Sequence, residues 1–239
     1  MKADHILLVA ALCSGMFLSV YTKKLSPGAS ACGGLIACLL FWGSGYAGVF
    51  MMVAFFVVGT AATGWKHRLK AGWGLAATDK ERRVASQVLA NAGVPALAAF
   101  IALCFPSLRE WCVIAIAAAF ASATSDTLSS ELGNVYGRRF YNVLTWKKDR
   151  RGENGVISLE GTLAGLAGSA IIAMLYSVFT GLTPLVAIVL LAGMAGNIFD
   201  SVLGATLERK HVISNDAVNF LNTFFAALLA AGILYSGSF

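Results

Sequence analysis

The sequence is divided into long apolar blocks that are separated by short polar segments. Each block is close to the roughly 20 residues that an α-helix needs to cross the hydrocarbon of a bilayer. Of the 239 residues, 58% are hydrophobic and only 13% are charged, so a soluble fold has too little polar surface to enclose these blocks. We therefore predict one all-α, polytopic transmembrane domain over 1–239, with short loops. The blocks lie at about 5–21, 29–44, 46–63, 84–105, 110–131, 157–180, 183–204 and 217–237.

Two of these blocks are short and nearly continuous. Only Gly43-Ser44-Gly45 separates 29–44 from 46–63. They can form two spans, or one broken or re-entrant segment. The sequence thus predicts seven to eight helices.

Lysine and arginine fall almost entirely on alternate loops. All of the 18 Lys and Arg residues except Lys2 and Arg109 follow the first, third, fifth or seventh block. Because cytoplasmic loops retain positive charge, we expect these loops in the cytoplasm and both termini outside, in a bacterial inner membrane. The net charge of +6 then reflects topology and not a nucleic-acid-binding face.

Two hairpins in the C-terminal half, 110–180 and 183–237, show a short internal resemblance. Asp126 and Asp200 each stand near the end of the first helix of a hairpin, and each is followed by a hydroxyl residue and later by an Asn-containing helix start. Such a recurrence is compatible with a pseudo-symmetric site, although a match this short also arises by chance.

Carboxylates stand near the basic ends of several apolar blocks. Charged side chains inside spans are costly and usually face a bundle interior or an aqueous cavity, so Asp126, Glu131, Glu160 and Asp200 are functional candidates. The competing explanation is simple pairing with interfacial Lys or Arg. Carboxylates are hard ligands that suit Mg²⁺, which binds one or two of them together with substrate phosphates.

Two helix starts on the same side complement these acids. The segments 154–162 and 215–222 begin helices whose free N–H groups and dipoles favour anions. Asn215, Asn219 and Asn222 share one helix face and are not expected to point at lipid. They can serve a ligand or form an interhelical hydrogen-bond ladder.

A basic loop follows the block at 110–131. Lys147, Lys148, Arg150 and Arg151 lie in it beside glycines, so we expect a flexible loop that folds over a phosphate. The competing explanation is a charge cluster that only sets topology. Aromatic residues in the same loop predict contact with membrane lipid headgroups.

Ordered motifs spread over most of the chain carry a family resemblance. The stretch 125–133 reads SDTLSSELG, which looks like the ADTxASExG signature of the integral-membrane family known as domain of unknown function 92. The remaining motifs are LSPGA at 25–29, QVLANAG at 87–93, NGVISLEGT at 154–162, DSVLGAT at 200–206 and NDAVN at 215–219.

This resemblance implies an enzyme. The family contains the phytyl-phosphate kinase of tocopherol synthesis. A fainter likeness links Asp126, Gly133, Lys147-Lys148 and Glu160 to CTP-dependent dolichol and phytol kinases. The resemblance therefore implies transfer of a γ-phosphoryl group from CTP, or another nucleoside triphosphate, to an isoprenyl monophosphate such as phytyl or geranylgeranyl phosphate.

We derive the following roles from the resemblance and the chemistry together. Asp126, Asp200 and Lys148 are the expected catalytic residues, and Asp126, Asp200 and Glu131 are the expected ligands of Mg²⁺. The expected substrate-binding residues are Glu131, Lys147, Arg150, Arg151, Asn154, Gly155, Ser158, Glu160, Asn215, Asp216, Asn219 and Asn222.

An alternative function is a transporter or flippase of an anionic isoprenoid lipid, which would use the same basic pocket without chemistry. A carrier needs polar residues along a path to both faces. The predicted outer connections are short and nearly uncharged, which favours a one-sided enzyme.

Overall fold

The computed structural model describes residues 3–75 and 82–237, so Lys2 and Lys80 lie outside the described residues. This part of the chain contains nine α-helices, of which seven are long and apolar enough to cross a membrane. The predicted all-α transmembrane bundle is confirmed. The seven spans are α2 (Pro27–Ser44), α3 (Tyr46–Gly64), α5 (Ala85–Cys104), α6 (Arg109–Tyr136), α7 (Leu159–Thr180), α8 (Pro184–Leu203) and α9 (Asn215–Tyr235).

Two further helices complete the set in the described residues. Helix α1 (Ala3–Tyr21) has a shorter apolar stretch, Val9–Tyr21, than the seven spans. Helix α4 (His67–Gly72) is a short helix that the apolar pattern does not predict. Short 3₁₀ and π turns, Pro106–Leu108 and Gly204–Glu208, flank α6 and α8.

The two blocks around Gly45 form two separate helices. Helix α2 ends at Ser44 and α3 begins at Tyr46, and each is long enough to span. Gly45 has a φ of +72°, a conformation that costs an L side chain free energy but is open to glycine. The backbone therefore reverses at this residue, which excludes one continuous broken helix.

Serine side chains begin three of the spans. Ser26, Ser158 and Ser214 each accept a hydrogen bond from the backbone N–H three residues further on. Such a cap is worth about 1 kcal/mol because it satisfies an otherwise free donor. The helices match the predicted blocks within a few residues, except that α6 continues to Tyr136, beyond the predicted end at 131.

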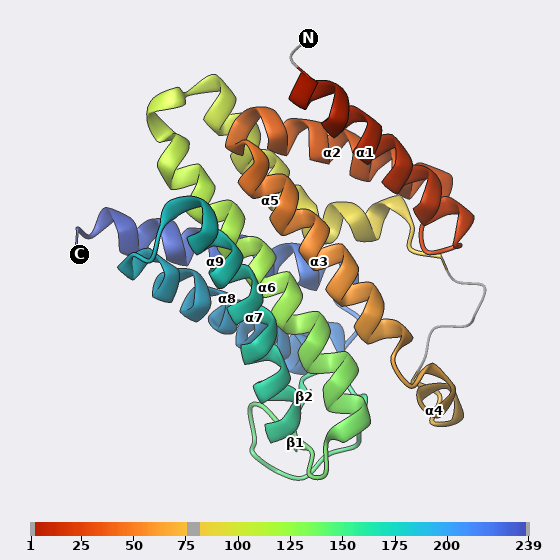
Figure 1. Ribbon diagram of the computed structural model, residues 1–239. Helices are drawn as coiled ribbons and strands as arrows, with labels where there is room; N and C mark the ends of the chain where they lie inside the picture. The colour runs from red at the N-terminus through yellow and green to blue at the C-terminus, as the bar shows by residue number, and fades with distance from the viewer. Residues whose placement is uncertain (1–2, 76–81, 238–239) are drawn as a thin grey trace.

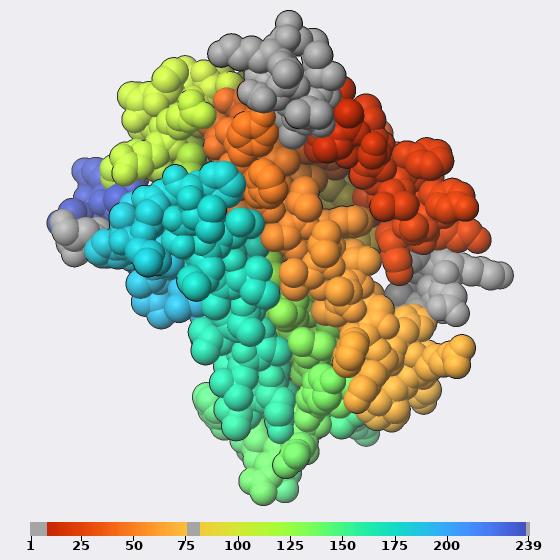
Figure 2. Space-filling view, viewed as in Figure 1, coloured from red at the N-terminus to blue at the C-terminus, as the bar shows by residue number. Residues whose placement is uncertain are grey.

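Helix α6 lies at the centre of the bundle and contacts α3, α5, α7, α8 and α9. Figure 1 shows it in green, running through the middle of the molecule. Every residue from Ile116 to Ser125 is buried, and half of them are alanines, whose small side chains let neighbouring helices approach. Figure 2 shows α7 in teal and α3 in orange side by side, covering much of α6.

Small residues pack closely between α6 and α7. A Cβ atom added at Gly161 or Gly168 would lie 2.9 Å or 2.8 Å from a backbone oxygen of α6, and one at Gly165 would lie 3.0 Å from Ser125 Oγ. These glycines therefore allow α7 to pack directly on the backbone of α6. That packing sets the position of the carboxylate-bearing end of α6.

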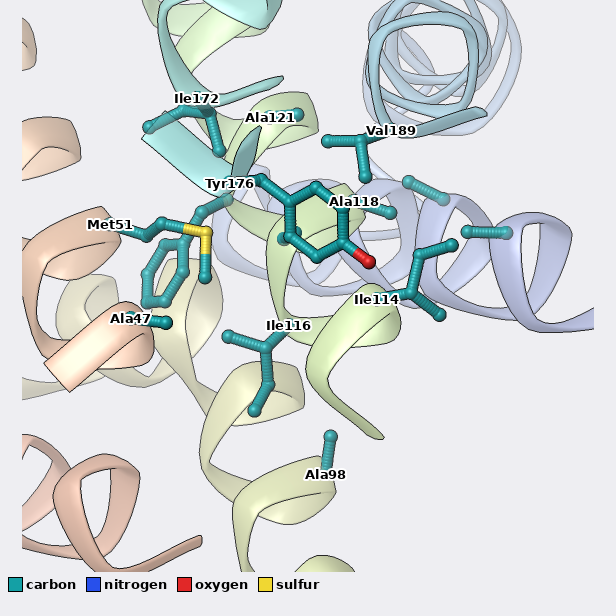
Figure 3. Close-up of a cluster of buried hydrophobic side chains, with 14 of the residues drawn as sticks. Ala47, Met51, Ala98, Ile114, Ile116, Ala118, Ala121, Ile172, Tyr176 and Val189 are labelled. Atoms are coloured by element: carbon teal, nitrogen blue, oxygen red, sulfur yellow. The ribbon is translucent and has the colours of Figure 1, made fainter. Parts of the chain in front are cut away.

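A tightly packed apolar core fills the half of the bundle away from that end. Ile114, Ile116, Ile172, Tyr176 and Val189 are at most 2% exposed. Figure 3 shows these side chains converging from α6, α7 and α8. The interior of this half is therefore apolar.

The basic loop after α6 is not an open, flexible segment as expected. Strands β1 (Tyr141–Asn142) and β2 (Val156–Ile157) pair in an antiparallel hairpin, which lies beside the ends of α6 and α7 in Figure 1. Paired strands form here because the chain must return from α6 to the neighbouring start of α7.

The basic loops meet at this one end of the bundle, as the alternate-loop charge pattern predicts. Contacts join loops that are far apart in the sequence. They are the backbone bridge of Leu25 with Arg83, the stacking of Arg151 on Trp73, and the ion pair of Arg209 with Asp149.

Candidate functional site

A polar cavity of about 160 Å³ lies where α6 and α8 approach the hairpin. Its walls carry carboxylates, side-chain amides and hydroxyl groups. No Lys or Arg of the described residues lines it. The acidic and amide residues of the lining are Asp126, Glu153, Asp200, Glu208, Asn134, Asn154, Asn197 and Asn215.

Two helix faces with the same spacing form opposite walls of this cavity. Each face presents four residues at positions i, i+3, i+4 and i+7, which lie on one side of an α-helix. Each face has a carboxylate, at least one serine and a glycine. The residues are Asp126, Ser129, Ser130 and Gly133 of α6, and Asn197, Asp200 and Ser201 of α8 with Gly204, which begins the π turn after α8.

The structure brings the two predicted catalytic acids together. The carboxyl groups of Asp126 and Asp200 are hydrogen-bonded to each other, and Asp126 also interacts electrostatically with Glu208 and Glu131. Neighbouring carboxylates in a partly buried site repel each other when both are ionised. A cation bound between them would remove this repulsion.

The donor set of the cavity suits Mg²⁺. No group of three or more His, Cys, Asp and Glu residues among those described is arranged to hold a metal. Mg²⁺ requires fewer protein ligands, because it keeps several waters and binds one or two carboxylates plus phosphate oxygens. Asp126 and Asp200 supply that number of carboxylates, and amides and hydroxyls surround them.

The hairpin closes the cavity at a point of very close contact. A Cβ atom at Gly155 would lie 2.4 Å from the backbone nitrogen of Ala205, in the π turn that follows α8. Gly155 also has a φ of +75°. Next to it, Asn154 is hydrogen-bonded to Glu208, so the hairpin and the end of α8 form one wall.

An ion pair holds the outer part of the hairpin. Arg209 Nη1 lies 2.8 Å from Asp149 Oδ2, and Arg209 Nη2 lies 3.6 Å from Glu153 Oε2. The hydrogen bond from Arg209, followed by one from the Arg150 backbone N–H, lowers the pKa of Asp149 to about 2. The same pair raises the pKa of Arg209. Both groups are charged at neutral pH and anchor the hairpin to the end of α8.

Of the predicted substrate-binding residues, four line the cavity: Asn154, Gly155, Ser158 and Asn215. Asn222 does not line it but donates a hydrogen bond to Asp200. Asp216 and Asn219 lie on α9 outside the lining.

The predicted basic residues lie outside the cavity. Lys147, Lys148 and Arg150 are exposed on the hairpin. Arg151 has its guanidinium 4.2 Å from the centre of the Trp73 ring and donates a hydrogen bond to Gly137 O. Arg151 thus connects the hairpin with the segment after α4.

Two further predicted acids have partners elsewhere. Glu131 pairs with Lys70 at 2.5 Å, and Lys70 is 1% exposed. Glu160 accepts a hydrogen bond from the Arg138 backbone N–H at 3.4 Å. Neither acid lines the cavity.

Sequence reasoning passed over Asn197 as a candidate and left Glu208 unassigned in the loop after α8, yet both line the cavity. A signal for Asn197 existed, because it precedes Asp200 by three positions and therefore shares its helix face. Glu208 lies at the end of the π turn, which changes the direction in which the side chains after Leu203 point, so regular helix spacing does not predict its place.

Comparison with known proteins identifies the family. The model of integral membrane protein DUF92 matches residues 9–227. Protein VTE6, chloroplastic, of Arabidopsis thaliana is 33% identical over 216 residues, which are 86% of this chain and 64% of that protein, so the chain spans less than two thirds of that relative. An uncharacterized membrane protein of Synechocystis is 32% identical over 88% of this chain and 83% of its own length.

A more distant relative extends the range of organisms. An uncharacterized membrane protein of Methanocaldococcus jannaschii is 29% identical over 82% of this chain and 79% of its own length. No solved structure matches the chain. The family model covers all seven spans except the end of α9, and it confirms the resemblance seen in the motifs. The chain therefore belongs to the family of integral membrane protein DUF92.

Proposed function

We propose that the protein is an isoprenyl-phosphate kinase that uses CTP or another nucleoside triphosphate. One observation carries this proposal: carboxylates from two neighbouring spans, Asp126 and Asp200, meet in a polar cavity at the basic end of the bundle. The similarity to VTE6 and the resemblance of the motifs to phytyl-phosphate kinase support a lipid monophosphate as the acceptor.

The proposed reaction makes few chemical demands on the protein. An oxygen of the acceptor monophosphate forms a bond to the γ-phosphorus, and the bond from that phosphorus to the β–γ bridging oxygen breaks, which releases the nucleoside diphosphate. The acceptor oxygen is already ionised near neutral pH, so no strong general base is needed. Catalysis then depends on positioning and on charge neutralisation.

The residues of the cavity fit these demands. Asp126 and Asp200 would hold Mg²⁺, and the cation would neutralise charge on the transferred phosphoryl group. The start of α7, capped by Ser158, and the start of α9, where Asn215 lines the cavity, present free backbone N–H groups to anions.

The size of the cavity determines which part of the substrates it takes. Pockets for whole small molecules have volumes of about 300–1,000 Å³, whereas this cavity has about 160 Å³. It therefore accepts the reacting phosphates, while the nucleoside stays on the hairpin side and the isoprenyl chain extends into lipid. Lys147, Lys148 and Arg150, exposed on the hairpin, would attract both anions to the entrance.

We place this basic end in the cytoplasm, where nucleotides are available. The positive-inside rule supports that orientation, because the loops of the opposite end carry Arg109 as their only described basic residue.

The test is a phosphotransfer assay on the purified full chain. We expect lipid diphosphate from γ-labelled CTP or ATP, Mg²⁺ and phytyl or geranylgeranyl monophosphate. Asp126→Asn and Asp200→Asn should abolish turnover while still eluting as folded protein. Ser169→Ala, which removes a hydrogen bond to Leu190 O and does not alter a cavity-lining residue, should keep activity. Lack of product from every pairing would overturn the kinase, and full activity in both Asn variants would overturn the metal assignment.

The packing of the bundle opposes the alternative of a lipid carrier. A polar path across the membrane would have to pass the apolar core around Ile116 and Tyr176, which is closely packed in Figure 3. A carrier would move labelled isoprenyl phosphate across vesicle membranes without nucleotide, and we expect no such movement.

A further inference from the structure

Asn197 is a buried amide whose side chain has no hydrogen-bond partner among the described residues. It lies on α8, one turn before Asp200, and is 5% exposed. Its backbone oxygen accepts a bond from Ser201 Oγ, whereas none of the side-chain hydrogen bonds of the described residues involves its amide group. The polar atoms of this amide are not sealed from the cavity, since no fully buried side-chain nitrogen or oxygen of the described residues lacks a partner. Buried amides are normally hydrogen-bonded, because leaving water without a new partner is costly. The side chain lines the same cavity as Asp126 and Asp200.

Helix α7 leaves room for this amide. A Cβ atom at position 165 would lie 2.7 Å from Asn197 Nδ2 and 3.0 Å from Ser125 Oγ, so an alanine at this position would have to displace the Asn197 amide. The amide nitrogen therefore packs against α7. Since Asn197 lines the cavity while its nitrogen lies beside α7, we infer that the carbonyl oxygen Oδ1 is the polar atom on the cavity side.

We propose that Asn197 Oδ1 is a third protein ligand, together with Asp126 and Asp200, of a divalent cation of the Mg²⁺ class. Two carboxylates and one amide oxygen form a hard donor set, and the remaining positions are left to water and phosphate oxygens. The inference rests on the proposed function for the presence of the cation. It adds an amide to a cavity in which the described Asp and Glu residues do not by themselves form a three-residue metal group.

The spacing on the helices makes the three ligands convergent. Asn197 and Asp200 are three positions apart and share the cavity face of α8, while Asp126 stands on the opposing face of α6. Because close glycine contacts fix α7 on α6, and Gly193 and Gly196 bring α8 equally close to α6, the two faces are held rigidly. A cation between them would contact both walls.

The test uses Mn²⁺ alone as the probe and needs neither nucleotide nor lipid. Mn²⁺ binding to the full-length purified protein is measured by the loss of the free-ion electron paramagnetic resonance signal. We expect Asn197→Leu to weaken Mn²⁺ binding about tenfold or more, because it deletes a ligand oxygen. Asn197→Asp keeps an oxygen at the same place and should bind Mn²⁺ at least as tightly as the wild type. Ser169→Ala should bind as the wild type does.

Three results would overturn the proposal: no Mn²⁺ binding by the wild type, unchanged binding by folded Asn197→Leu, or equal weakening in Asn197→Leu and Asn197→Asp. If Asn197→Leu does not fold, Asn197→Ser, whose shorter side chain withdraws the oxygen, takes its place with the same expected loss. The outcome is separable from the kinase assay. If Mn²⁺ binding depends on the Asn197 side chain but no phosphotransfer is found, the ligand assignment stands and the proposed kinase activity fails. If the wild type shows turnover but Asn197→Leu binds Mn²⁺ with unchanged affinity, only this inference is refuted.

Discussion

The side-chain nitrogen of Asn222 donates a hydrogen bond to Oδ2 of Asp200, at a distance of 2.5 Å. Asn222 is fully buried, and its own Oδ1 accepts a hydrogen bond from Ser122 Oγ at 3.0 Å. The series Ser122, Asn222 and Asp200 thus joins α6, α9 and α8. It fixes the orientation of the Asp200 carboxylate at the wall of the cavity.

Asn222→Leu should reduce phosphotransfer by about 10- to 100-fold, because residues that orient a metal ligand are typically worth that much. Asp200 would keep its charge but lose the bond that sets its rotamer. The assay is turnover with Mg²⁺, together with Mn²⁺ affinity, in protein that elutes as the wild type does. Ser169→Ala is the control for loss of a buried interhelical bond. Wild-type turnover in Asn222→Leu would show that Asp200 needs no such support.

Gly155→Ala should strongly reduce activity, because the added Cβ would meet the Ala205 backbone and push the hairpin away from the π turn. Gly152→Ala is the matched control. Gly152 also has a positive φ, +79°, but the atoms nearest to its Cβ would all belong to the side chain of Leu75, which can move. Both glycines line the cavity, and both variants carry strain of about 1–2 kcal/mol, so a lower turnover of Gly155→Ala than of Gly152→Ala reports the contact with the Ala205 backbone. Equal turnover would contradict the role of the hairpin.

Lys70→Met should destabilise the protein by about 3 kcal/mol, because it leaves Glu131 and two carbonyl groups without their buried partner. Chemical unfolding in detergent measures this change. Glu131→Gln should also reduce stability while leaving Mn²⁺ affinity near that of the wild type, since Glu131 does not line the cavity. A large loss of Mn²⁺ affinity in Glu131→Gln would instead restore Glu131 as a metal ligand.

The hairpin anchor should weaken only in strong acid. The pKa of Asp149 is about 2 in the folded protein, below the ordinary value of 3.8, owing mainly to Arg209. The stabilisation is therefore fully present above pH 3.8 and is lost as the pH falls through about 2. Asp149→Asn should lower the thermal unfolding midpoint at neutral pH, and the difference from the wild type should shrink as the pH falls from about 3.8 through about 2. Arg209→Leu should remove the same pH dependence, and a difference that stays constant over this range would contradict this explanation.

Parts of the site could be predicted because they depend only on local chemistry. Asp126 and Asp200 are costly in an apolar span wherever its neighbours lie, and the serine caps of α7 and α9 act within one turn. The loop residues Lys147 to Arg151 could not be placed in this way. Their positive charge sets topology from any loop conformation, but their distance from a phosphate depends on the strand pairing of the hairpin.

The sequence by itself determined the positions and approximate lengths of the apolar blocks, the basic end and the presence of acids within the spans, because hydropathy and charge act residue by residue against the bilayer. Only the tertiary structure decided which polar groups share a cavity. Glu131 turns to Lys70 while Asp126 turns to Asp200, five positions earlier on the same helix, because helix rotation and glycine contacts with α7 direct the two faces to different neighbours. Asn197 belongs to the cavity for the same reason: its place depends on Gly165 of another helix, a contact that no local pattern specifies.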